Sequence, residues 1–208
     1  MNLYSFLSIG YDLLDKIWFS DRGINPRDAI KELLPNEKCK VLDMCCGTFS
    51  NGLPIAKKNP KSRVVGLDRS KEMLREARGK VRAEGLENVT LACRDATQTG
   101  FREESFDYII LGLVLHECNA ELWEGILAEA RRLLKPDGKL IVLEWNKQTK
   151  TSRKIKFALL YGMEILTNPG YFRYFYNSDK EAFFERYGFR TIENRECNYT
   201  SVLSMCKE

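Results

Sequence analysis

The sequence contains one histidine, His116, and no two cysteines separated by two residues. Its seven cysteines are odd in number and have no cluster of histidines beside them, which excludes a disulfide framework and a zinc site. No run of eighteen apolar residues occurs, and the first residues lack the basic head and apolar stretch of a secretory signal. We therefore expect a cytoplasmic protein with no metal and no transmembrane segment.

A strong charge of one sign is also missing. The 33 basic and 29 acidic side chains are spread along the chain and give a net charge of +4. This excess is too small to indicate a nucleic-acid partner. With 208 residues, the chain is long enough for one domain with a filled core and too short for two ordinary domains. We expect a single domain, whose oligomeric state the sequence leaves open.

Apolar residues recur at three- and four-residue spacing over residues 3–19, which predicts an amphipathic helix. A second short helix is expected to begin at Pro26 and to continue to Leu34. We interpret the first helix as packed on the edge of the domain. The alternative is weak peripheral contact with a membrane surface, against which its acidic polar side argues.

From Cys39 onward, continuous apolar segments alternate with segments of helical periodicity. The expected strands are residues 39–44, 63–68, 88–92, 106–112 and 138–145, and the expected helices between them are residues 51–59, 70–84 and 120–135. This alternation predicts an α/β fold with a parallel sheet covered by helices on both faces.

The alternation of strand and helix segments ends after Trp145, where a basic run leads into a cluster of tyrosines and phenylalanines. Such an insertion beside a ligand crevice suits a substrate lid, and a helix followed by two strands closes the chain. The predicted organisation is one domain over residues 1–208. Its parts are an N-terminal helical cap (1–36), a cofactor-binding core (37–145), a lid insertion (146–178) and a C-terminal helix and strand pair (179–208).

Two of the expected strands end in an acid. Asp43 leaves the first strand and enters a tight loop, and Asp68 leaves the second. In a dinucleotide-binding fold this loop receives a pyrophosphate, which a carboxylate would repel. S-adenosylmethionine has no phosphate and carries an ammonium and a sulfonium, so it suits an acid beside exposed backbone amides. The pattern therefore predicts a cationic adenosyl cofactor.

With these residues in place, the chain resembles the class I S-adenosylmethionine-dependent methyltransferases. Within them it is similar to the methyltransferase type 11 group, which includes the ubiquinone and menaquinone C-methyltransferases. The resemblance covers roughly residues 39–145 and is carried by five segments in the expected order: residues 41–48, residues 66–70 with Met73 and Leu74, residues 94–96, residues 105–109 and residues 133–138. It implies a Rossmann-like, doubly wound, seven-stranded mixed sheet with a small helical cap, in which the last strand is antiparallel and inserted before the sixth.

The resemblance also implies a set of cofactor-binding residues. Asp43, Cys45 and Gly47 would line the methionine end, and Asp68 would bind both ribose hydroxyls. The other implied residues are Arg69 and Met73 near the adenine, Asp95 and Ala96 at its amino group, and Leu111, Gly112 and Leu113 beneath the methyl donor. Tyr11 and Tyr174 are further candidates for contacts to the cofactor or acceptor from the cap and lid.

The loop departs from the family pattern of three glycines at two positions, because Cys45 stands at the first and Phe49 at the third. Cysteine is a small substitute. A phenylalanine ring beside the ligand is expected to narrow the site or to require another backbone path, and Gly52 is a possible source of the missing freedom.

Methyl transfer from a sulfonium requires alignment and exclusion of water more than catalytic groups. His116 follows the fourth strand, where it is either a base or acceptor-orienting group, or a capping and packing histidine. Glu144 leaves the fifth strand and is either catalytic or a surface acid paired with a lysine.

The sequence thus favours an S-adenosylmethionine-dependent methyltransferase that acts on a small, apolar or aromatic acceptor by in-line displacement, with S-adenosylhomocysteine as its product. The alternative is a non-catalytic sensor or scaffold that binds the adenosyl cofactor, an idea that Phe49 and the scarcity of bases motivate. Methylation of RNA or protein ranks below both because no extended basic surface is evident. A nicotinamide oxidoreductase is disfavoured by Asp43 and by the altered glycine spacing.

Overall fold

The computed structural model describes residues 25–167 and 169–208. The helix predicted over residues 3–19, and Tyr11 with it, lies outside these described residues. Within them, no helix is long and apolar enough to cross a membrane.

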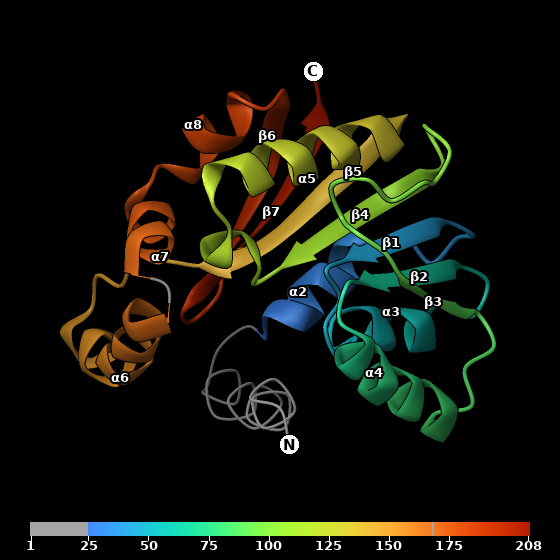
Figure 1. The fold of residues 1–208 in the computed structure, drawn as a ribbon, viewed down its shortest axis with the longest axis horizontal. Coiled ribbons are helices and arrows are strands. Elements are labelled where there is room, and N and C mark those ends of the chain that lie inside the picture. The colour runs from blue at the N-terminus through green and yellow to red at the C-terminus, as the bar shows by residue number, and fades with distance from the viewer. Residues whose placement is uncertain (1–24, 168) are drawn as a thin grey trace.

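Figure 1 shows the order of helices and strands along the chain. The elements are α2 (Pro26–Leu33), β1 (Lys40–Met44), α3 (Gly52–Lys58), β2 (Arg63–Asp68), α4 (Lys71–Ala83), β3 (Val89–Cys93), β4 (Phe106–Gly112), the 3-10 helix η1 (Leu115–Glu117), α5 (Ala120–Leu133), β5 (Leu134–Trp145), α6 (Thr151–Thr167), α7 (Pro169–Asn177), α8 (Lys180–Glu185), β6 (Phe189–Glu196) and β7 (Thr200–Lys207).

The seven strands form one mixed sheet in the order β3-β2-β1-β4-β5-β7-β6. Strands β1 to β5 are parallel to one another, whereas β7 is antiparallel to both β5 and β6 and lies between them. This confirms the predicted sheet and its inserted last strand. The strand order reverses between β1 and β4, and ligands of doubly wound folds bind at such a switch point, beyond the carboxyl ends of the strands.

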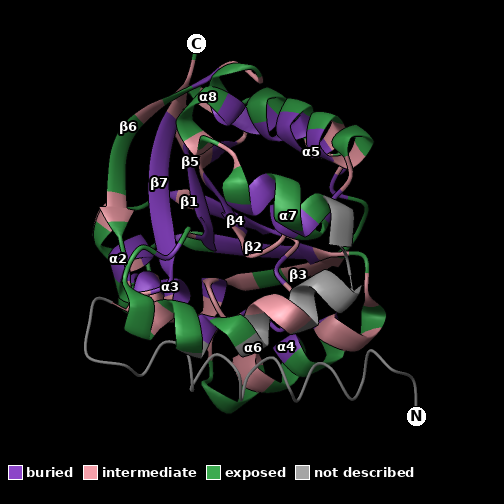
Figure 2. Ribbon diagram, turned by 90° about the vertical axis from the view of Figure 1, so that its left-hand side faces the viewer, coloured by how far each residue is buried: buried purple, intermediate pink, exposed green. Residues whose placement is uncertain are grey.

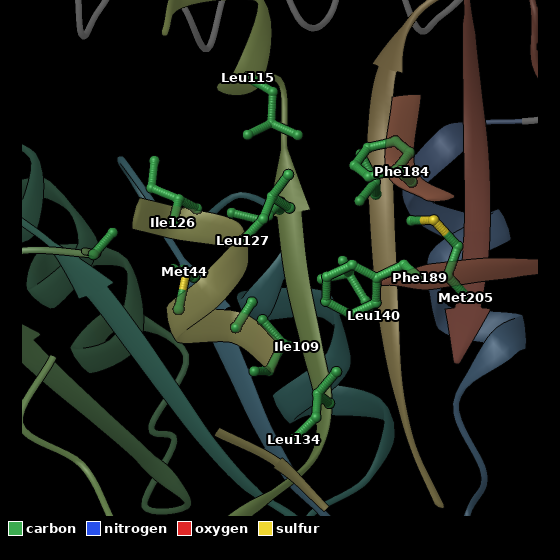
Figure 3. Packing of buried hydrophobic residues seen from close by; sticks show 14 of the residues in the cluster. Met44, Ile109, Leu115, Ile126, Leu127, Leu134, Leu140, Phe184, Phe189 and Met205 are labelled. Atoms are coloured by element: carbon green, nitrogen blue, oxygen red, sulfur yellow. The ribbon is translucent and has the colours of Figure 1, made fainter. Parts of the chain in front are cut away.

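Alternating side chains of the strands pack against helices on two faces. On one face, Leu42 and Met44 of β1 join a core with α5 and α8, and Figure 3 shows Met44 near Ile126 of α5. On the other face, Val41 packs with α2, α3 and α4. Strand β7 is buried along most of its length, while the edge strand β6 is largely exposed (Figure 2). Asp43, two residues after Val41, therefore belongs to the α3 side of the sheet.

The boundary between α5 and β5 differs from the prediction. We expected the helix to reach residue 135 and the strand to begin at residue 138, but α5 ends at Leu133 and β5 begins at Leu134. Leu134 is completely buried and pairs with Phe106, and residues 135–138 then bulge out before Lys139 pairs with Tyr108. Pro136 lies in this bulge, where its missing N–H interrupts no ladder.

Helices α6 and α7 occupy the segment predicted to form the lid. They lie at the end of the sheet toward which the parallel strands point (Figure 1). Their described aromatic side chains contact the ends of β5 and β7 in a separate cluster, which we call the aromatic cluster. Its members are Trp145, Phe157, Phe172, Tyr176 and Tyr199, with Tyr161 packed against them.

Candidate functional site

The loop that follows β1 turns through three residues with left-handed backbone. The φ angles are 60° at Cys45, 51° at Gly47 and 65° at Phe49. These are the three positions at which the family pattern has glycine, because only glycine adopts this conformation without a steric penalty. The loop keeps the glycine-loop shape although two of its three positions carry side chains.

The ring of Phe49 lies in the core beneath the loop. It is completely buried in the core on the α3 side of the sheet. A Cβ atom added to Gly52 would lie 2.0 Å from the ring, and one added to Gly66 would lie 2.8 Å from it. Gly52 thus provides space for the ring and not backbone freedom, since its φ is not positive. The expected narrowing of the site by Phe49 is wrong, because the ring lies under the loop.

Asp43 lies beneath the loop with no solvent exposure. Its Oδ2 accepts a hydrogen bond from the backbone N–H of Gly52 at 2.9 Å, which satisfies one donor at the start of α3. Its Oδ1 is buried and has no hydrogen-bond partner among the described residues. Burial raises the pKa of Asp43 from 3.8 to about 7, and the nearby Asp68 adds to this increase. A cation placed at Oδ1 would stabilise the ionised form of this carboxyl.

Asp68 ties the loop to the second strand. Its Oδ2 accepts from the backbone N–H of Gly47 at 2.8 Å, and its Oδ1 accepts from the N–H of Ser70 at 2.8 Å. A carboxylate oxygen accepts more than one hydrogen bond, so both oxygens keep capacity for a ligand hydroxyl. The predicted residues Asp43, Cys45, Gly47 and Asp68 are therefore brought together around one loop.

The raised pKa of the buried Asp43 carboxyl predicts how the free energy of unfolding depends on pH. The folded protein holds this proton more tightly than the unfolded chain, because the pKa is raised to about 7. Its contribution to stability is therefore complete below about pH 4 and is lost as the pH rises through about 7. Between about pH 5 and about pH 8 the loss amounts to about 2–3 kcal/mol.

Asp43→Asn is neutral at every pH, so its free energy of unfolding should rise relative to that of the wild type between about pH 5 and about pH 8. Urea unfolding at both pH values measures the difference, with Asp95→Asn as a control on an exposed aspartate. A difference between Asp43→Asn and the wild type that stays constant across the two pH values would contradict the role of this carboxyl.

The floor of the candidate site is formed by the last residues of β4, Leu111 and Gly112, and by Leu113, which follows the strand. Leu111 is buried and pairs with Met44 of β1. Leu113 has a positive φ of 55° and donates its N–H to the carbonyl of Leu143. A strained backbone directly after β4, at the switch point between β1 and β4, is consistent with a functional position.

The adenine end of the predicted site lies beyond β2 and β3. Asp95 is exposed, and its Oδ1 accepts from both the N–H and the hydroxyl of Thr97 at 2.7 Å, which lowers the pKa of the Asp95 carboxyl. Ala96 is buried, Met73 is half-buried and Arg69 is exposed. The structure places these residues after the strands that the resemblance implies, and their role toward adenine stays a prediction.

One residue that holds this end was not found from the sequence. Glu129 of α5 is 7% exposed, and its Oε1 accepts from the N–H and the hydroxyl of Thr99 at 2.9 and 2.6 Å. Arg132 donates to both oxygens of the same carboxylate, which lowers the pKa of Glu129. Glu129 thereby fastens the loop that carries Asp95 to the body of the domain. Its position on an otherwise ordinary amphipathic helix gave no signal.

His116 and Glu144 form a buried pair at the edge of the site. The His116 Nδ1 lies 2.8 Å from Oε2 of Glu144, and the two residues are 2% and 0% exposed. The Glu144 Oε1 accepts from the N–H groups of Val114 and Leu115 at 3.1 and 2.8 Å. The prediction that Glu144 is a surface acid paired with a lysine is wrong, because its partners are a histidine and two backbone amides in the interior.

This hydrogen-bond pattern fixes the ring of His116. An ionised carboxylate only accepts, so with Glu144 in this form His116 donates from Nδ1–H and the lone pair of the neutral ring is on Nε2. The Nε2 atom lies 4.0 Å from Oε1 of the exposed Glu117, which is longer than a hydrogen bond. The arrangement is that of a histidine oriented by an acid and able to take up a proton at Nε2.

The aromatic cluster lies against this pair. The ring of Phe172 in α7 meets the His116 ring edge to face, with centroids 5.6 Å apart and an angle of 86°. Tyr174, which we expected at the site, instead stacks on Trp123 and is 49% exposed. The residue of the predicted lid that contacts the histidine is therefore Phe172. The sequence alone does not show which residue in this run of aromatic residues faces the histidine, because that depends on the rotation of α7 about its axis.

The residues of this site fit a cationic adenosyl cofactor. The unpartnered Oδ1 of Asp43 is an acceptor placed at the start of the loop, and Asp68 has acceptor capacity one strand further along the sheet. No phosphate is required by this arrangement, and the two acids would oppose one.

Comparisons with known proteins agree with this geometry. Residues 41–138 match the family model described as methyltransferase domain. The chain is 33% identical to the demethylmenaquinone methyltransferase of Geobacillus stearothermophilus over 149 residues, which are 71% of this chain and 63% of that protein. It is 32% identical to the enzyme of the same name from Anoxybacillus flavithermus over 174 residues, which are 83% of this chain and 68% of that protein.

Solved structures share the fold at lower identity. An S-adenosylmethionine-dependent methyltransferase from Aquifex aeolicus superposes with a TM-score of 0.71 at 19% identity and covers 98% of both chains. Mitomycin 7-O-methyltransferase superposes with a TM-score of 0.73 at 15% identity and covers the whole of this chain and 61% of its own.

The sheet order and the loop thus define a class I methyltransferase fold. With the sequence relatives added, the chain belongs to the family of S-adenosylmethionine-dependent methyltransferases. It matches 63% of the length of the first relative named above.

Proposed function

We propose that this protein transfers a methyl group from S-adenosylmethionine to a small acceptor with an apolar or aromatic body, and that His116 and Glu144 activate the acceptor. The observation that carries the proposal is the buried histidine of η1, just after β4, which is held by Glu144 and contacted by Phe172. Its buried position and two named partners favour a base or orienting group over a plain packing residue.

The chain's own residues divide the work. When bound, the cofactor supplies an activated methyl group that leaves a neutral thioether behind. Asp43 and Asp68 hold its cationic and hydroxyl groups, and the aromatic cluster excludes water from the acceptor. His116 takes the proton of an acceptor hydroxyl or enol at Nε2 as the new bond to the methyl carbon forms, and Glu144 stabilises the resulting imidazolium.

The acceptor is proposed to carry an aromatic or quinone-type ring. Two flat side chains of the aromatic cluster, Trp145 and Phe172, lie beside the His116 ring, with centroids 6.4 and 5.6 Å from it, which suits a planar apolar acceptor. The name of the sequence relatives, demethylmenaquinone methyltransferase, supports a quinone-type acceptor. A test mixes the protein with S-adenosylmethionine and a panel of hydroxylated naphthalenes, catechols and simple amines, and measures S-adenosylhomocysteine. Product from amines alone would contradict an acceptor that needs a base.

Asp68 is expected to be necessary for cofactor affinity. Removal of a charged hydrogen-bond acceptor costs about 1.5–3 kcal/mol per bond. Asp68→Ala should therefore weaken cofactor binding by at least about 100-fold if the hydrogen bonds to both ribose hydroxyls are lost. Calorimetric titration with S-adenosylmethionine measures this loss.

Because Asp68 also accepts from Gly47 and Ser70, Asp68→Asn is the matched control that retains an oxygen for the loop. It should bind with intermediate affinity. No heat from the wild-type protein, or an unchanged affinity of Asp68→Ala, would contradict the proposed cofactor site.

One of the two arguments for a non-catalytic protein was that Phe49 would hinder cofactor binding, and the position of its ring weakens that argument. The ring of Phe49 lies in the core and leaves the loop open to a ligand. Tight cofactor binding without S-adenosylhomocysteine from any acceptor of the panel would favour a sensor over an enzyme.

A further inference from the structure

Asn51 occupies the position just before α3 but does not perform the usual role of an asparagine there. It is the N-cap residue of that helix, yet its backbone is helical, with φ −88° and ψ −43°, and its side chain makes no capping hydrogen bond. Asparagine is among the preferred N-cap residues because its side-chain oxygen accepts from the first helical N–H groups. Here the carboxylate of Asp43 takes that place by accepting from Gly52 N–H. The amide of Asn51 is thereby released from capping.

The side chain of Asn51 is instead directed to the end of β4. A Cβ atom added to Gly112 would lie 2.2 Å from Nδ2 of Asn51 and 3.6 Å from its Oδ1. Only the missing side chain of Gly112 therefore leaves room for the amide at this place. Gly112 is the last residue of β4, on the strand that pairs with β1 at the switch point of the sheet.

The Oδ1 atom of Asn51 is buried and has no hydrogen-bond partner among the described residues. A buried polar atom without a partner is destabilising, and native structures keep few of them. Two such oxygens, on Asp43 and Asn51, thus belong to the segment that joins the end of β1 to α3. Two such acceptors on one segment suit a ligand group with several donors and a positive charge.

We propose that Asn51 is a cofactor-binding residue whose Oδ1 accepts a hydrogen bond from the methionine ammonium, beside the Asp43 carboxylate. This inference rests on the proposed function, because it assigns a further residue to the same cofactor. An ammonium carries three N–H donors and can therefore donate to both acceptors. The amide oxygen of Asn51 adds a second acceptor to the Asp43 carboxylate.

Asn51→Leu is a suitable test because leucine has a similar volume and leaves no polar atom to satisfy, so the fold should be retained. Thermal unfolding verifies this. Two ligands are titrated by calorimetry into wild type and variant: S-adenosylhomocysteine, which has the amino-acid end, and methylthioadenosine, which lacks it. We expect the variant to bind S-adenosylhomocysteine about tenfold to a hundredfold more weakly and methylthioadenosine within about twofold of the wild type.

A second variant separates acceptance from donation. Asn51→Asp keeps an oxygen for the ammonium, so its affinity for S-adenosylhomocysteine should equal or exceed that of the wild type. A strong loss with Asn51→Asp would show that the amide donates to the ligand carboxylate, which overturns the proposal. Equal losses for both ligands with Asn51→Leu would assign a structural role and also overturn it. A wild-type protein that binds neither ligand would refute the proposed function itself.

Discussion

Glu144→Gln is expected to lower the rate of methyl transfer by about 100-fold to 10,000-fold, while the affinity for S-adenosylhomocysteine changes little. In the wild type the carboxylate accepts from two backbone amides with one oxygen and from His116 Nδ1–H with the other. The glutamine amide keeps the oxygen for the backbone donors and turns its NH₂ group toward the histidine. His116 must then accept at Nδ1 and carry its proton on Nε2, where no lone pair is left for the acceptor.

The measurement is a single-turnover assay with a phenolic acceptor, together with calorimetry for the cofactor product. A more acidic phenol, already ionised at the assay pH, provides the control, since it needs no base and should be methylated by Glu144→Gln at nearly the wild-type rate. His116→Gln should behave in the same way. Equal losses with ionised and neutral acceptors would show that the pair serves packing and not proton transfer.

The second large effect concerns stability. Phe49→Ala is expected to lower the free energy of unfolding by about 3–5 kcal/mol. The ring is completely buried, and the residues beneath it include Gly52 and Gly66, which have no side chains to move into the space. The variant also keeps a residue with a Cβ atom at a left-handed position, so it gains no relief of backbone strain.

Urea unfolding followed by circular dichroism measures this change. Ile192→Ala is the matched control, because Ile192 lies on the edge strand β6 and is 50% exposed, and its change should remain within about 0.5 kcal/mol. A loss below about 1 kcal/mol for Phe49→Ala would mean that the ring does not support the loop.

Much of the fold follows from the sequence because the parallel strands are continuous apolar runs and the helices between them are amphipathic. Residues 63–68 and 106–112 form strands with the predicted bounds. The start of β5 could not be predicted from local pattern. Pro136 and Gly138 are typical of a turn, whereas Leu134 is drawn into the sheet by its pairing with Phe106, which is remote in sequence.

In the candidate site, too, local sequence patterns predict some residues, whereas others depend on contacts between residues remote in sequence. Asp43 and Asp68 could be predicted as candidates because an acid at a strand exit is a local signal, and their hydrogen bonds to Gly52 and Gly47 join them around the loop. The partner of His116 depends on which residue of β5 faces the end of β4, and no local pattern contains that information. Asn51, which we propose as a further cofactor-binding residue, could not be predicted for a related reason, since the placement of its side chain depends on the absent side chain of Gly112.

The accommodation of Phe49 has a consequence for sequence divergence. Because its ring fills the space above two bare α-carbons, positions 49, 52 and 66 form one steric unit. A homologue with glycine at position 49 has room for a side chain such as alanine or serine at position 52. A homologue that keeps phenylalanine at position 49 does not. Amino-acid identities at the three positions should therefore co-vary across an alignment, and ancestral exchanges there should have occurred as coupled pairs.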